Sequence, residues 1–296
     1  MGEGAPLRAA VIGGGHMGRI HARKLLANPE VELVAVVDPA PLDGVELPWA
    51  DELPEGIDLA VVAVPTTLHL KVALPLLEAG VACLVEKPLA ASVEEAVLLA
   101  PFERLMVNHI ERFNPALEPL LGSSARYIKC ERLAPAPKGG TLRCADVDVV
   151  HDLMVHDLDL VRHLSGGEVV EVRAVGASLI TEGVDIAEVW CETDNGCVAL
   201  LTASRASSTR TRTIRLVDGD SYFSVDLDRR SASRTAWSDD LSREELGGFD
   251  GDAIERAHAA FIAMARGEAT SPVTGRDGLA VVELAARVSA AIEERR

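Results

Sequence analysis

A short apolar segment followed at once by a glycine-rich turn limits the fold of this chain more than any other part of the sequence. Leu7–Ile12 has the length of a β-strand, and Gly13-Gly-Gly15-His-Met-Gly18 follows it directly. A helical pattern then runs over about residues 17–27. The motif G-x-G-x-x-G between a strand and a helix is typical of the first unit of a doubly wound parallel sheet, so we expect an α/β fold.

The glycines of this motif predict a binding site for the phosphates of a dinucleotide. In such a motif Gly13 permits the tight turn, Gly15 lets backbone N–H groups approach a pyrophosphate, and Gly18 allows close packing of helix and strand. The phosphates lie at the start of the helix, beside His16 and Met17, where unpaired N–H groups and the helix dipole favour negative charge. A glycine-rich turn without a ligand is the structural alternative.

An acidic residue at the end of the next predicted strand indicates which cofactor is bound. Asp38 lies twenty residues after Gly18, where a carboxylate can accept hydrogen bonds from the adenine ribose and repel a 2′-phosphate. No arginine follows it in Pro39-Ala-Pro-Leu42, so we predict NAD rather than NADP. The structural alternative is an aspartate that begins an Asp-Pro turn.

The apolar patterns divide the chain into two domains, which we place at residues 1–112 and 113–296. In the first, short apolar runs alternate with helical segments, so we expect an N-terminal Rossmann domain. Its irregular part is 38–57, where four prolines and no helical period predict a crossover without a regular helix. The strands expected in this domain are 7–12, 31–37, 59–64, 81–85 and 105–107, with a helix over 68–79.

The second domain is expected to be α+β, with an open-faced, mainly antiparallel sheet. Its long stretches alternate between apolar and polar residues, as strands with one exposed face do. We expect these strands at 125–133, 169–179, 186–193, 196–203, 211–217 and 221–228. Helices are expected over 146–164, 252–266 and 276–295, and the last of these could pack back on the first domain.

The composition excludes several classes of partner. With 46 acidic and 29 basic residues the net charge is −17, so the chain lacks the positive field that nucleic acid requires. The five cysteines form no C-x-x-C pair and have no histidine at zinc spacing, which predicts reduced thiols and no metal. Neither a signal peptide nor an apolar run of the ~20 residues needed to span a membrane is present, so we expect a cytoplasmic protein.

Two segments contain the residue types needed for proton transfer. Val85-Glu86-Lys87-Pro88 ends a predicted strand at the edge where α/β sheets bind ligands, although an exposed lysine in an ordinary turn is the alternative. On the predicted helix 146–164, Asp152 and His156 lie four residues apart and share a face. A carboxylate and an imidazole there suit proton abstraction from an alcohol. The alternatives are a buried structural histidine and a metal pair with His151.

In this order, the glycine-rich turn, Glu-Lys-Pro and Asp-x-x-x-His resemble the glucose–fructose oxidoreductase and inositol dehydrogenase family (Gfo/Idh/MocA). The resemblance covers nearly the whole chain. It implies a Rossmann domain joined to an open-faced sheet whose exposed face commonly forms the oligomer interface, and hence a homodimer or homotetramer. We expect Arg210, Arg212 and Arg215 to lie together on that exposed face.

The resemblance also implies roles for individual residues. Lys87 would contact both the nicotinamide ribose and the substrate, and Glu86 the cofactor ribose. Asp152 would orient the substrate, and His156 would be the general base. The segment that lines the cofactor corresponds to Pro65, Thr66 and His69. The proline-rich stretch after Asp38 departs from the family pattern.

Within the family, residues 107–115 and 151–157 look most like UDP-N-acetylglucosamine 3-dehydrogenases. This makes Arg112 and Asn114 candidate substrate contacts, with a hinge arginine paired to an acid and an Asn-Pro turn as the structural alternatives. We therefore expect NAD-dependent oxidation of a secondary hydroxyl of a sugar or sugar nucleotide. Two alternatives stay open: a reductase of another carbonyl or imine in the superfamily, and an NAD-binding regulator without turnover.

Overall fold

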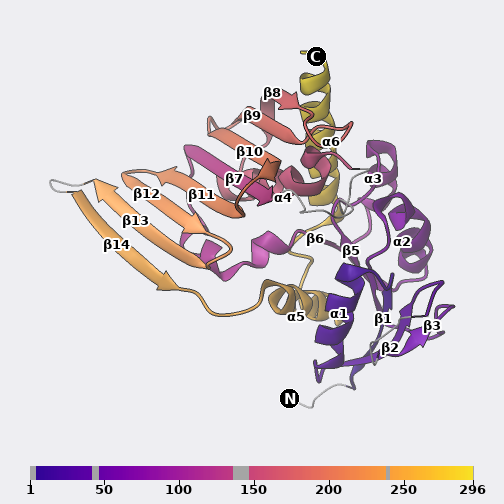
Figure 1. Ribbon diagram of the computed structural model, residues 1–296. Helices are drawn as coiled ribbons and strands as arrows, with labels where there is room; N and C mark the ends of the chain where they lie inside the picture. Colours follow the sequence, from indigo (N-terminus) through magenta and orange to yellow (C-terminus); the bar gives the residue numbers. More distant parts are fainter. Residues whose placement is uncertain (1–4, 42–46, 136–146, 238–240, 296) are drawn as a thin grey trace. The chain divides into compact units, whose positions relative to one another are not determined.

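The computed structural model describes residues 5–41, 47–135, 147–237 and 241–295, and the chain divides into two compact units (Figure 1). Unit 1 comprises Met1–Ile110 and Ile254–Val282, and unit 2 comprises Glu111–Ala253 and Glu283–Arg296. The sequence-based prediction was a single division after residue 112. In the structure, the chain therefore leaves unit 1 after Ile110 and returns to it near its C-terminal end.

Unit 1 contains a six-stranded parallel sheet in the order β3-β2-β1-β4-β5-β6. Its strands are β1 (Leu7–Ile12), β2 (Val31–Val37), β3 (Trp49–Ala50), β4 (Leu59–Val62), β5 (Ala82–Glu86) and β6 (Leu105–Asn108). Every residue of β4, β5 and β6 is buried, because helices pack on both faces of the sheet. The strand order reverses between β1 and β4, which is the point where sheets of this kind bind ligands.

Helices α1 and α2 lie on opposite sides of this sheet (Figure 1). The helical segments of unit 1 are α1 (His16–Leu26), η1 (Thr66–Leu68), α2 (His69–Glu78), α3 (Val93–Leu99), α5 (Ala253–Ala265) and the first part of α6 (Gly275–Glu293). The sequence analysis did not predict α3. Its signal is a capping box: the Ser92 hydroxyl accepts from the Glu95 N–H at 3.3 Å, and the Glu95 carboxylate accepts from the Ala91 N–H at 3.2 Å.

Unit 2 contains an eight-stranded sheet in the order β14-β13-β12-β11-β7-β10-β9-β8. All its strand pairs are antiparallel except β7 with β10, so the expected mainly antiparallel sheet is confirmed. Its strands are β7 (Tyr127–Pro135), β8 (Val169–Ala177), β9 (Ile186–Thr193), β10 (Val198–Ser207), β11 (Thr211–Asp218), β12 (Ser221–Asp226), β13 (Ser231–Trp237) and β14 (Leu241–Gly248).

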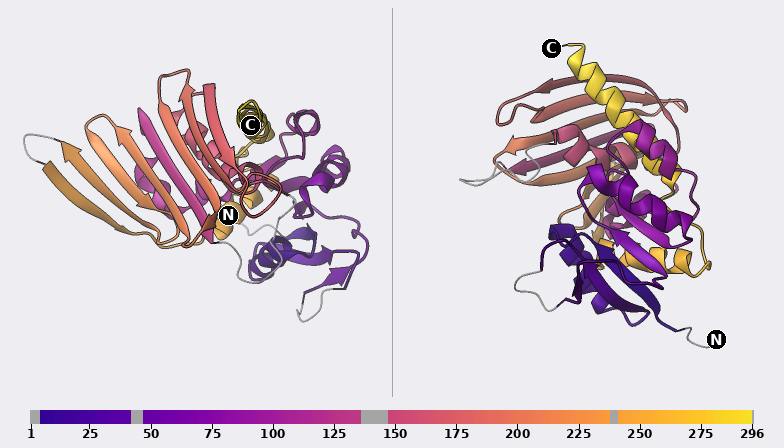
Figure 2. Two further views of the ribbon diagram at one scale, coloured as in Figure 1. Left: turned by 45° about the horizontal axis from the view of Figure 1, so that its top comes forward. Right: turned by 90° about the vertical axis from the view of Figure 1, so that its right-hand side faces the viewer.

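Strands β13 and β14 were not predicted. Of these, β14 is an edge strand, which has little to bury. Seven of the eight residues of β14 are exposed, so its sequence shows no apolar alternation. On one face of the sheet pack η3 (Pro115–Leu120), the π-helical turn η4 (Val150–Met154), α4 (Val155–Ser165) and the last part of α6. The other face carries no helix of the described residues (Figure 2). Burial in β7 accordingly alternates along the strand.

The expectation that Arg210, Arg212 and Arg215 share one face is wrong. Side chains alternate along a strand, so positions 212 and 215, an odd number apart, point to opposite faces. Arg212 lies opposite the buried Arg132 on β7 and forms an ion pair with Glu111. Arg215 lies opposite Lys129 and binds Glu131 at 2.9 Å, among half-buried residues of the open face.

The four cysteines at described positions are buried free thiols: Cys83, Cys130, Cys191 and Cys197. Burial raises the pKa of Cys83 to about 12, so this thiol is held in its unreactive protonated form. Cys144 and the start of the helix predicted from residue 146 lie outside the described residues. Within those residues, none of the helices combines the length and apolarity that a membrane crossing needs.

Candidate active site

The glycine-rich turn between β1 and α1 can be formed only by glycine at two of its positions. Gly13 has a φ of +104°, and a Cβ there would lie 2.5 Å from the carbonyl oxygen of Ala63. At Gly18 a Cβ would lie 1.8 Å from the carbonyl oxygen of Gly13. These two contacts hold α1 against the turn and fix where the helix begins.

The space in front of α1 fits an anionic cofactor. A Cβ on Gly15, the N-cap residue, would meet no atom within 4 Å, so the turn is open at this point. No side chain caps the helix and its first turn contains no acidic residue. His16 is exposed beside it and Met17 is half-buried. Free N–H groups at an uncapped helix start are the donors that a pyrophosphate requires.

Asp38 reaches back from the end of β2 to the same turn. Its carboxylate accepts a hydrogen bond from the Gly14 N–H at 2.7 Å and another from the Ala40 N–H at 3.0 Å. The first bond brings the predicted ribose-binding acid to the predicted phosphate site. The second is the local turn that the structural alternative proposed. The contact of Asp38 with a cofactor ribose stays a prediction.

Glu86, at the end of β5, is directed into a buried polar cluster, which we define as His21, Glu86, Asn108 and His258. Its Oε1 accepts from Asn108 Nδ2 at 2.8 Å and lies 2.9 Å from His21 Nε2, while Oε2 accepts from the Lys87 N–H at 3.2 Å. Burial acts to raise the pKa of Glu86, but the bonds from His21 and Asn108 outweigh it and the pKa is lowered. The carboxylate therefore supports the segment that carries Lys87, and its contact with cofactor ribose stays a prediction.

The cluster continues from α1 to α5, because His21 Nδ1 lies 2.8 Å from His258 Nε2. Both imidazoles are at most 1% exposed. Sequence analysis did not find this pair, since 237 residues separate its members and neither stands in a recognisable motif. Lys87 itself is half-buried, directly after β5 and before Pro88.

His69, predicted to lie in the cofactor-lining segment, has a buried ring that contacts two loops. Its Nδ1 lies 3.0 Å from the carbonyl oxygen of Pro88, and its Nε2 lies 3.1 Å from that of Val64. Burial lowers the pKa of His69, against the backbone carbonyls, which act to raise it. The ring contacts both the loop after β4 and the loop that follows Lys87, but a neutral imidazole donates to only one of them. Pro65 and Thr66 begin η1 beside it, the first exposed and the second half-buried.

In unit 2, Asp152 lies in a π-helical turn and His156 in the first turn of the α-helix that continues it. Both side chains are half-buried. A π-helical turn is rare and is frequently found at functional sites, because the extra residue per turn re-aims the side chains around it. His151 was the alternative metal partner, and its Nδ1 lies 2.8 Å from Asp148 Oδ1. No group of three or more metal-ligating side chains occurs among the described residues.

For Arg112 and Asn114 the structure favours the structural alternatives. Arg112 donates to Asp159 through Nε at 2.8 Å and Nη2 at 2.6 Å, and the side chains are 8% and 1% exposed. Asn114 caps η3 by accepting from the Ala116 N–H, and donates to the carbonyl oxygen of Leu227 at 3.2 Å. The guanidinium of Arg112 is therefore committed to a buried carboxylate.

A second buried ion pair network lies beside it, and sequence analysis missed it. Arg132, 2% exposed, donates to Asp157 through Nη2 at 2.8 Å and to Glu111 through Nη1 at 2.9 Å. Glu111 also pairs with Arg212 at 3.3 Å. We define these residues as the ion network. An alternating strand pattern predicts an apolar side chain at position 132, so no sequence signal indicates an arginine buried there.

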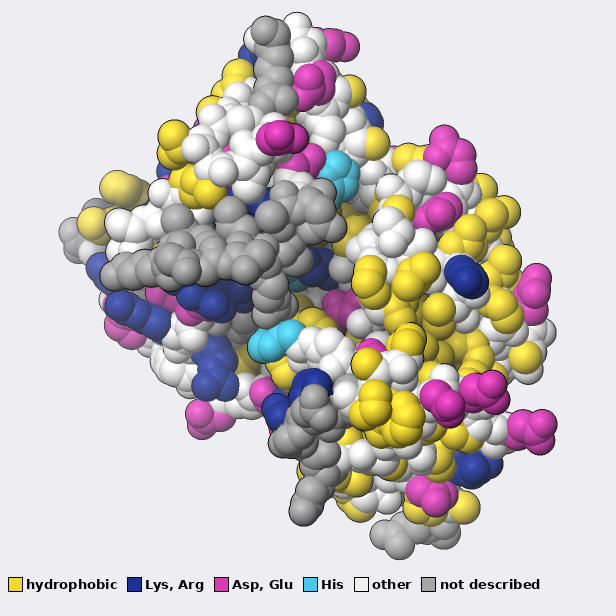
Figure 3. Space-filling model, turned by 45° about the vertical axis from the view of Figure 1, so that its right-hand side comes forward, with side chains coloured by type: hydrophobic (Ala, Val, Ile, Leu, Met, Phe, Trp, Pro, Cys, Tyr) yellow, Lys and Arg dark blue, Asp and Glu magenta, His cyan; other side chains and the backbone are white. Residues whose placement is uncertain are grey.

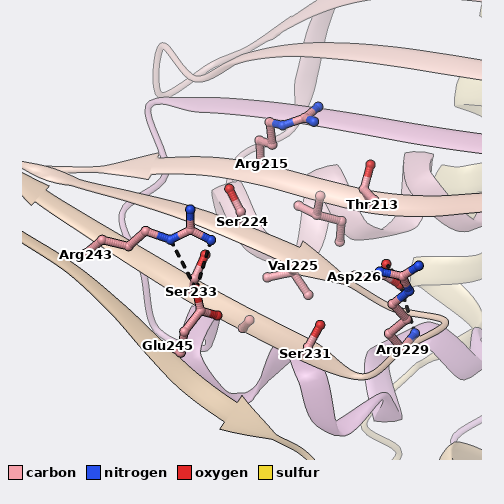
Figure 4. Close-up of a pocket in the computed structure, with 12 residues that line it drawn as sticks. Thr213, Arg215, Ser224, Val225, Asp226, Arg229, Ser231, Ser233, Arg243 and Glu245 are labelled. Atoms are coloured by element: carbon pink, nitrogen blue, oxygen red, sulfur yellow. Dashed lines mark hydrogen bonds and ion pairs between the residues drawn. The ribbon is translucent and has the colours of Figure 1, made fainter.

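The structure thus gathers the predicted residues in two groups. Unit 1 contains the glycine turn with Asp38, and also Glu86 and Lys87 at the end of β5 with His69. Unit 2 contains Asp152 and His156. On the open face of unit 2, strands β11–β14 line a shallow hollow in which hydroxyls alternate with charged pairs (Figure 4). Figure 3 shows another side of the molecule, on which Lys and Arg side chains gather in one part and acidic side chains are scattered.

Comparisons with known proteins agree with this division. Residues 7–104 match a profile described as oxidoreductase family, NAD-binding Rossmann fold, and residues 129–221 match the GFO/IDH/MocA C-terminal domain. The chain is 39% identical to UDP-N-acetylglucosamine 3-dehydrogenase of Acidithiobacillus ferrooxidans over 75% of its length and 74% of that protein. It is 26% identical to inositol 2-dehydrogenase of Rhizobium meliloti over 98% of both chains.

A solved structure extends the first similarity to nearly the whole chain. The crystal structure of UDP-N-acetylglucosamine 3-dehydrogenase GnnA from Acidithiobacillus ferrooxidans superimposes with a TM-score of 0.87 at 34% identity, covering 98% of this chain and 99% of that one. Both the Rossmann-like domain and the antiparallel sheet domain therefore have counterparts in a single solved protein.

Proposed function

The chain belongs to the GFO/IDH/MocA family of NAD-binding oxidoreductases, and on that premise we propose that it oxidises a secondary hydroxyl of a sugar nucleotide, UDP-N-acetylglucosamine at C3. The membership confirms the resemblance found in the three motifs. The observation that carries the finer proposal is the match of 34% identity and TM-score 0.87 with a UDP-N-acetylglucosamine 3-dehydrogenase over 98% of the chain. Such an enzyme is a dehydrogenase acting on the CH–OH group of a sugar.

Each unit contributes a different part of the proposed chemistry. His156 of unit 2 accepts the proton of the hydroxyl, because an imidazole has its pKa near working pH. The Lys87 ammonium of unit 1 stabilises the negative charge that develops on the oxygen. Asp152 orients the substrate beside His156. When bound at the glycine turn, NAD supplies the acceptor for the hydride from carbon.

The cofactor preference follows from Asp38. Its carboxylate is fixed at the turn by the 2.7 Å hydrogen bond from Gly14, so a 2′-phosphate on the adenine ribose would approach a negative charge. We therefore propose NAD rather than NADP.

We propose further that the enzyme is a homodimer or homotetramer assembled through the open face of the unit 2 sheet. That face combines apolar and paired polar groups, such as the Arg173 guanidinium 4.9 Å from the centre of the Trp190 ring. A second copy would cover such a surface. Light scattering at several protein concentrations gives the subunit number, and a monomer at all of them would contradict this part of the proposal.

The decisive experiment is a test of substrates. The protein is incubated with NAD and UDP-N-acetylglucosamine, and NADH is followed by absorbance while a ketone trap removes the product. Oxidation of UDP-N-acetylglucosamine, with little oxidation of free N-acetylglucosamine, is the expected result. Efficient oxidation of myo-inositol alone would instead indicate an inositol dehydrogenase, and the chain is 26% identical to one such enzyme. Tight NAD binding with no turnover of any sugar would indicate a regulator.

A further inference from the structure

A sugar nucleotide brings the negative charge of its diphosphate to a protein whose own net charge is −17. Such a ligand binds only where cations are gathered locally. Arg112, which the sequence analysis favoured for this purpose, is held by both oxygens of Asp159 in a buried pair. The Arg112 side chain is only 8% exposed, so it is closed to a ligand from solvent and the diphosphate needs other cations.

Three arginines line a hollow where β11 begins and β12 ends. Arg210, Arg212 and Arg229 surround it together with Thr211, and it measures about 480 Å³, including the solvent at its mouth. The arginine side chains are 57%, 31% and 84% exposed. Figure 4 shows Arg229 next to Asp226 at the end of the neighbouring strands. We call this site the arginine hollow, and its guanidinium groups are open to a ligand from solvent.

The arginine hollow has more positive than negative groups. Three arginines and two carboxylates line it. Arg210 binds Asp228 at 2.8 Å, Arg212 lies 3.6 Å from the same carboxylate, and Arg229 lies 3.7 Å from Asp226. Arg212 shares its partner Glu111 with Arg132. Burial and the positive charge of Arg132 and Arg210 lower the pKa of Arg212. A guanidinium remains charged in proteins, and a bound anion would offset the part of this shift that comes from Arg132 and Arg210.

Ion pairs connect the arginine hollow to the helix that carries the proposed base. Arg212 Nη1 lies 3.3 Å from Glu111 Oε1, and that oxygen lies 2.9 Å from Arg132 Nη1. Arg132 in turn binds Asp157 at 2.8 Å, and Asp157 directly follows His156 on α4. Because the diphosphate of a sugar nucleotide is attached to C1 of the ring, its binding groups must lie near those that act on C3.

On these grounds we propose that the arginine hollow binds the diphosphate of a nucleotide-sugar substrate, an inference that rests on the proposed function. Arginine suits this task since its fork donates two parallel hydrogen bonds to phosphate oxygens, in a geometry that lysine does not reproduce. Arg210 and Arg229 are the exposed contacts at the mouth, while Arg212 is held in place by Glu111.

The test uses the double variant Arg210→Ala/Arg229→Ala, because both side chains are exposed and their loss leaves the buried ion network intact. Arg243→Ala is the matched control: its side chain is 69% exposed and pairs with Glu245 in the same way, but it does not line the arginine hollow. UDP binding is measured by calorimetry, with inorganic pyrophosphate as a competitor. KM and kcat are measured with UDP-N-acetylglucosamine.

In the double variant we expect the affinity for UDP to fall at least tenfold and KM for the sugar nucleotide to rise by a similar factor, with kcat within about twofold of the parent. The control should match the parent. If the parent oxidises UDP-N-acetylglucosamine and the double variant has an unchanged KM and UDP affinity, the arginine hollow is not the diphosphate site although the proposed function stands. A second outcome is that the parent binds UDP and the double variant does not, but no sugar nucleotide is oxidised. This would support the diphosphate site and contradict the proposed reaction. A parent that neither binds UDP nor oxidises the sugar nucleotide overturns both.

Discussion

The two units bury charge in different ways. In unit 1 the polar cluster joins one carboxylate, Glu86, to two imidazoles and an amide. In unit 2 the ion network joins a guanidinium, Arg132, to two carboxylates. The loop that carries Lys87 therefore rests on imidazole and amide groups around one carboxylate, while the helix that carries His156 rests on one guanidinium shared by two carboxylates.

The largest expected effect tests whether each unit contributes to catalysis. Replacing His156 with Ala, or Lys87 with Met, should lower kcat by a factor of about 10² to 10⁴, the usual contribution of one positioned acid–base group. Affinity for NAD, measured by calorimetry, should change little in the His156 variant. His163→Ala, an exposed histidine on the same helix, is the control and should retain parental kcat. Parental turnover in His156→Ala would remove this histidine from the mechanism.

The second prediction concerns the loss of the central cation of the ion network in unit 2. Arg132→Met leaves Asp157 and Glu111 buried without their main partner, so the free energy of unfolding should fall by about 3–5 kcal/mol. Denaturant unfolding followed by circular dichroism measures this loss. Arg173→Met removes an arginine that is 62% exposed and paired with Glu171, and it should cost less than about 1 kcal/mol. Equal losses in the two variants would show that the ion network is not a stability element.

These clusters also show what the sequence could predict. Gly13, Gly18 and Asp38 were found because a turn, a helix start and a strand end follow one another within a few residues. Lys87 and His156 were found through short motifs. The ion network was missed because 21 residues separate Arg132 from Glu111, and the pairing exists only once β7 lies against η2 (Ile110–Phe113). Long-range polar contacts leave no periodic pattern. Arg215 was misplaced for another reason: it lies an odd number of residues from Arg212, so strand alternation puts the two side chains on opposite faces.

A third prediction concerns the cofactor in unit 1. NAD should bind more tightly than NADP, and Asp38→Ala should reduce the difference in affinity by about tenfold by removing the carboxylate that faces the 2′-position. Both cofactors are titrated by calorimetry with parent and variant. Since Asp38 also accepts from the Gly14 N–H, we expect NAD itself to bind less tightly to the variant. Equal affinity for both cofactors in the parent would exclude this role of Asp38.

The smallest expected effect concerns the titration of unit 1. The pKa of His69 is lowered in the folded protein, so at pH values below its ordinary value of 6.5 the unfolded chain binds a proton that the folded chain does not. The stability from this residue is complete above pH 6.5 and is lost as pH falls toward the folded pKa, by up to about 1.4 kcal/mol per unit of difference.

Thermal unfolding between pH 5 and 7.5 tests this, and His69→Gln should show a flatter dependence on pH than the parent. His163→Gln, which replaces an exposed histidine, should follow the parent. An identical slope in parent and His69→Gln would assign the acid sensitivity to other groups.

The division of unit 1 between the two ends of the chain has a consequence for biosynthesis. The N–H of Val107 bonds to the carbonyl oxygen of Val273 at 2.9 Å, and Gly278 packs so closely on Leu89 that a Cβ there would lie 3.0 Å away. A nascent chain of 110 residues therefore contains all six strands of the sheet but lacks the later segment that packs against Val107 and Leu89. At about 5–20 residues per second, translation of that segment follows on the order of ten seconds later. During this interval the groups that the later segment covers stay exposed, and we expect a truncation that removes residues 254–282 to leave them exposed permanently.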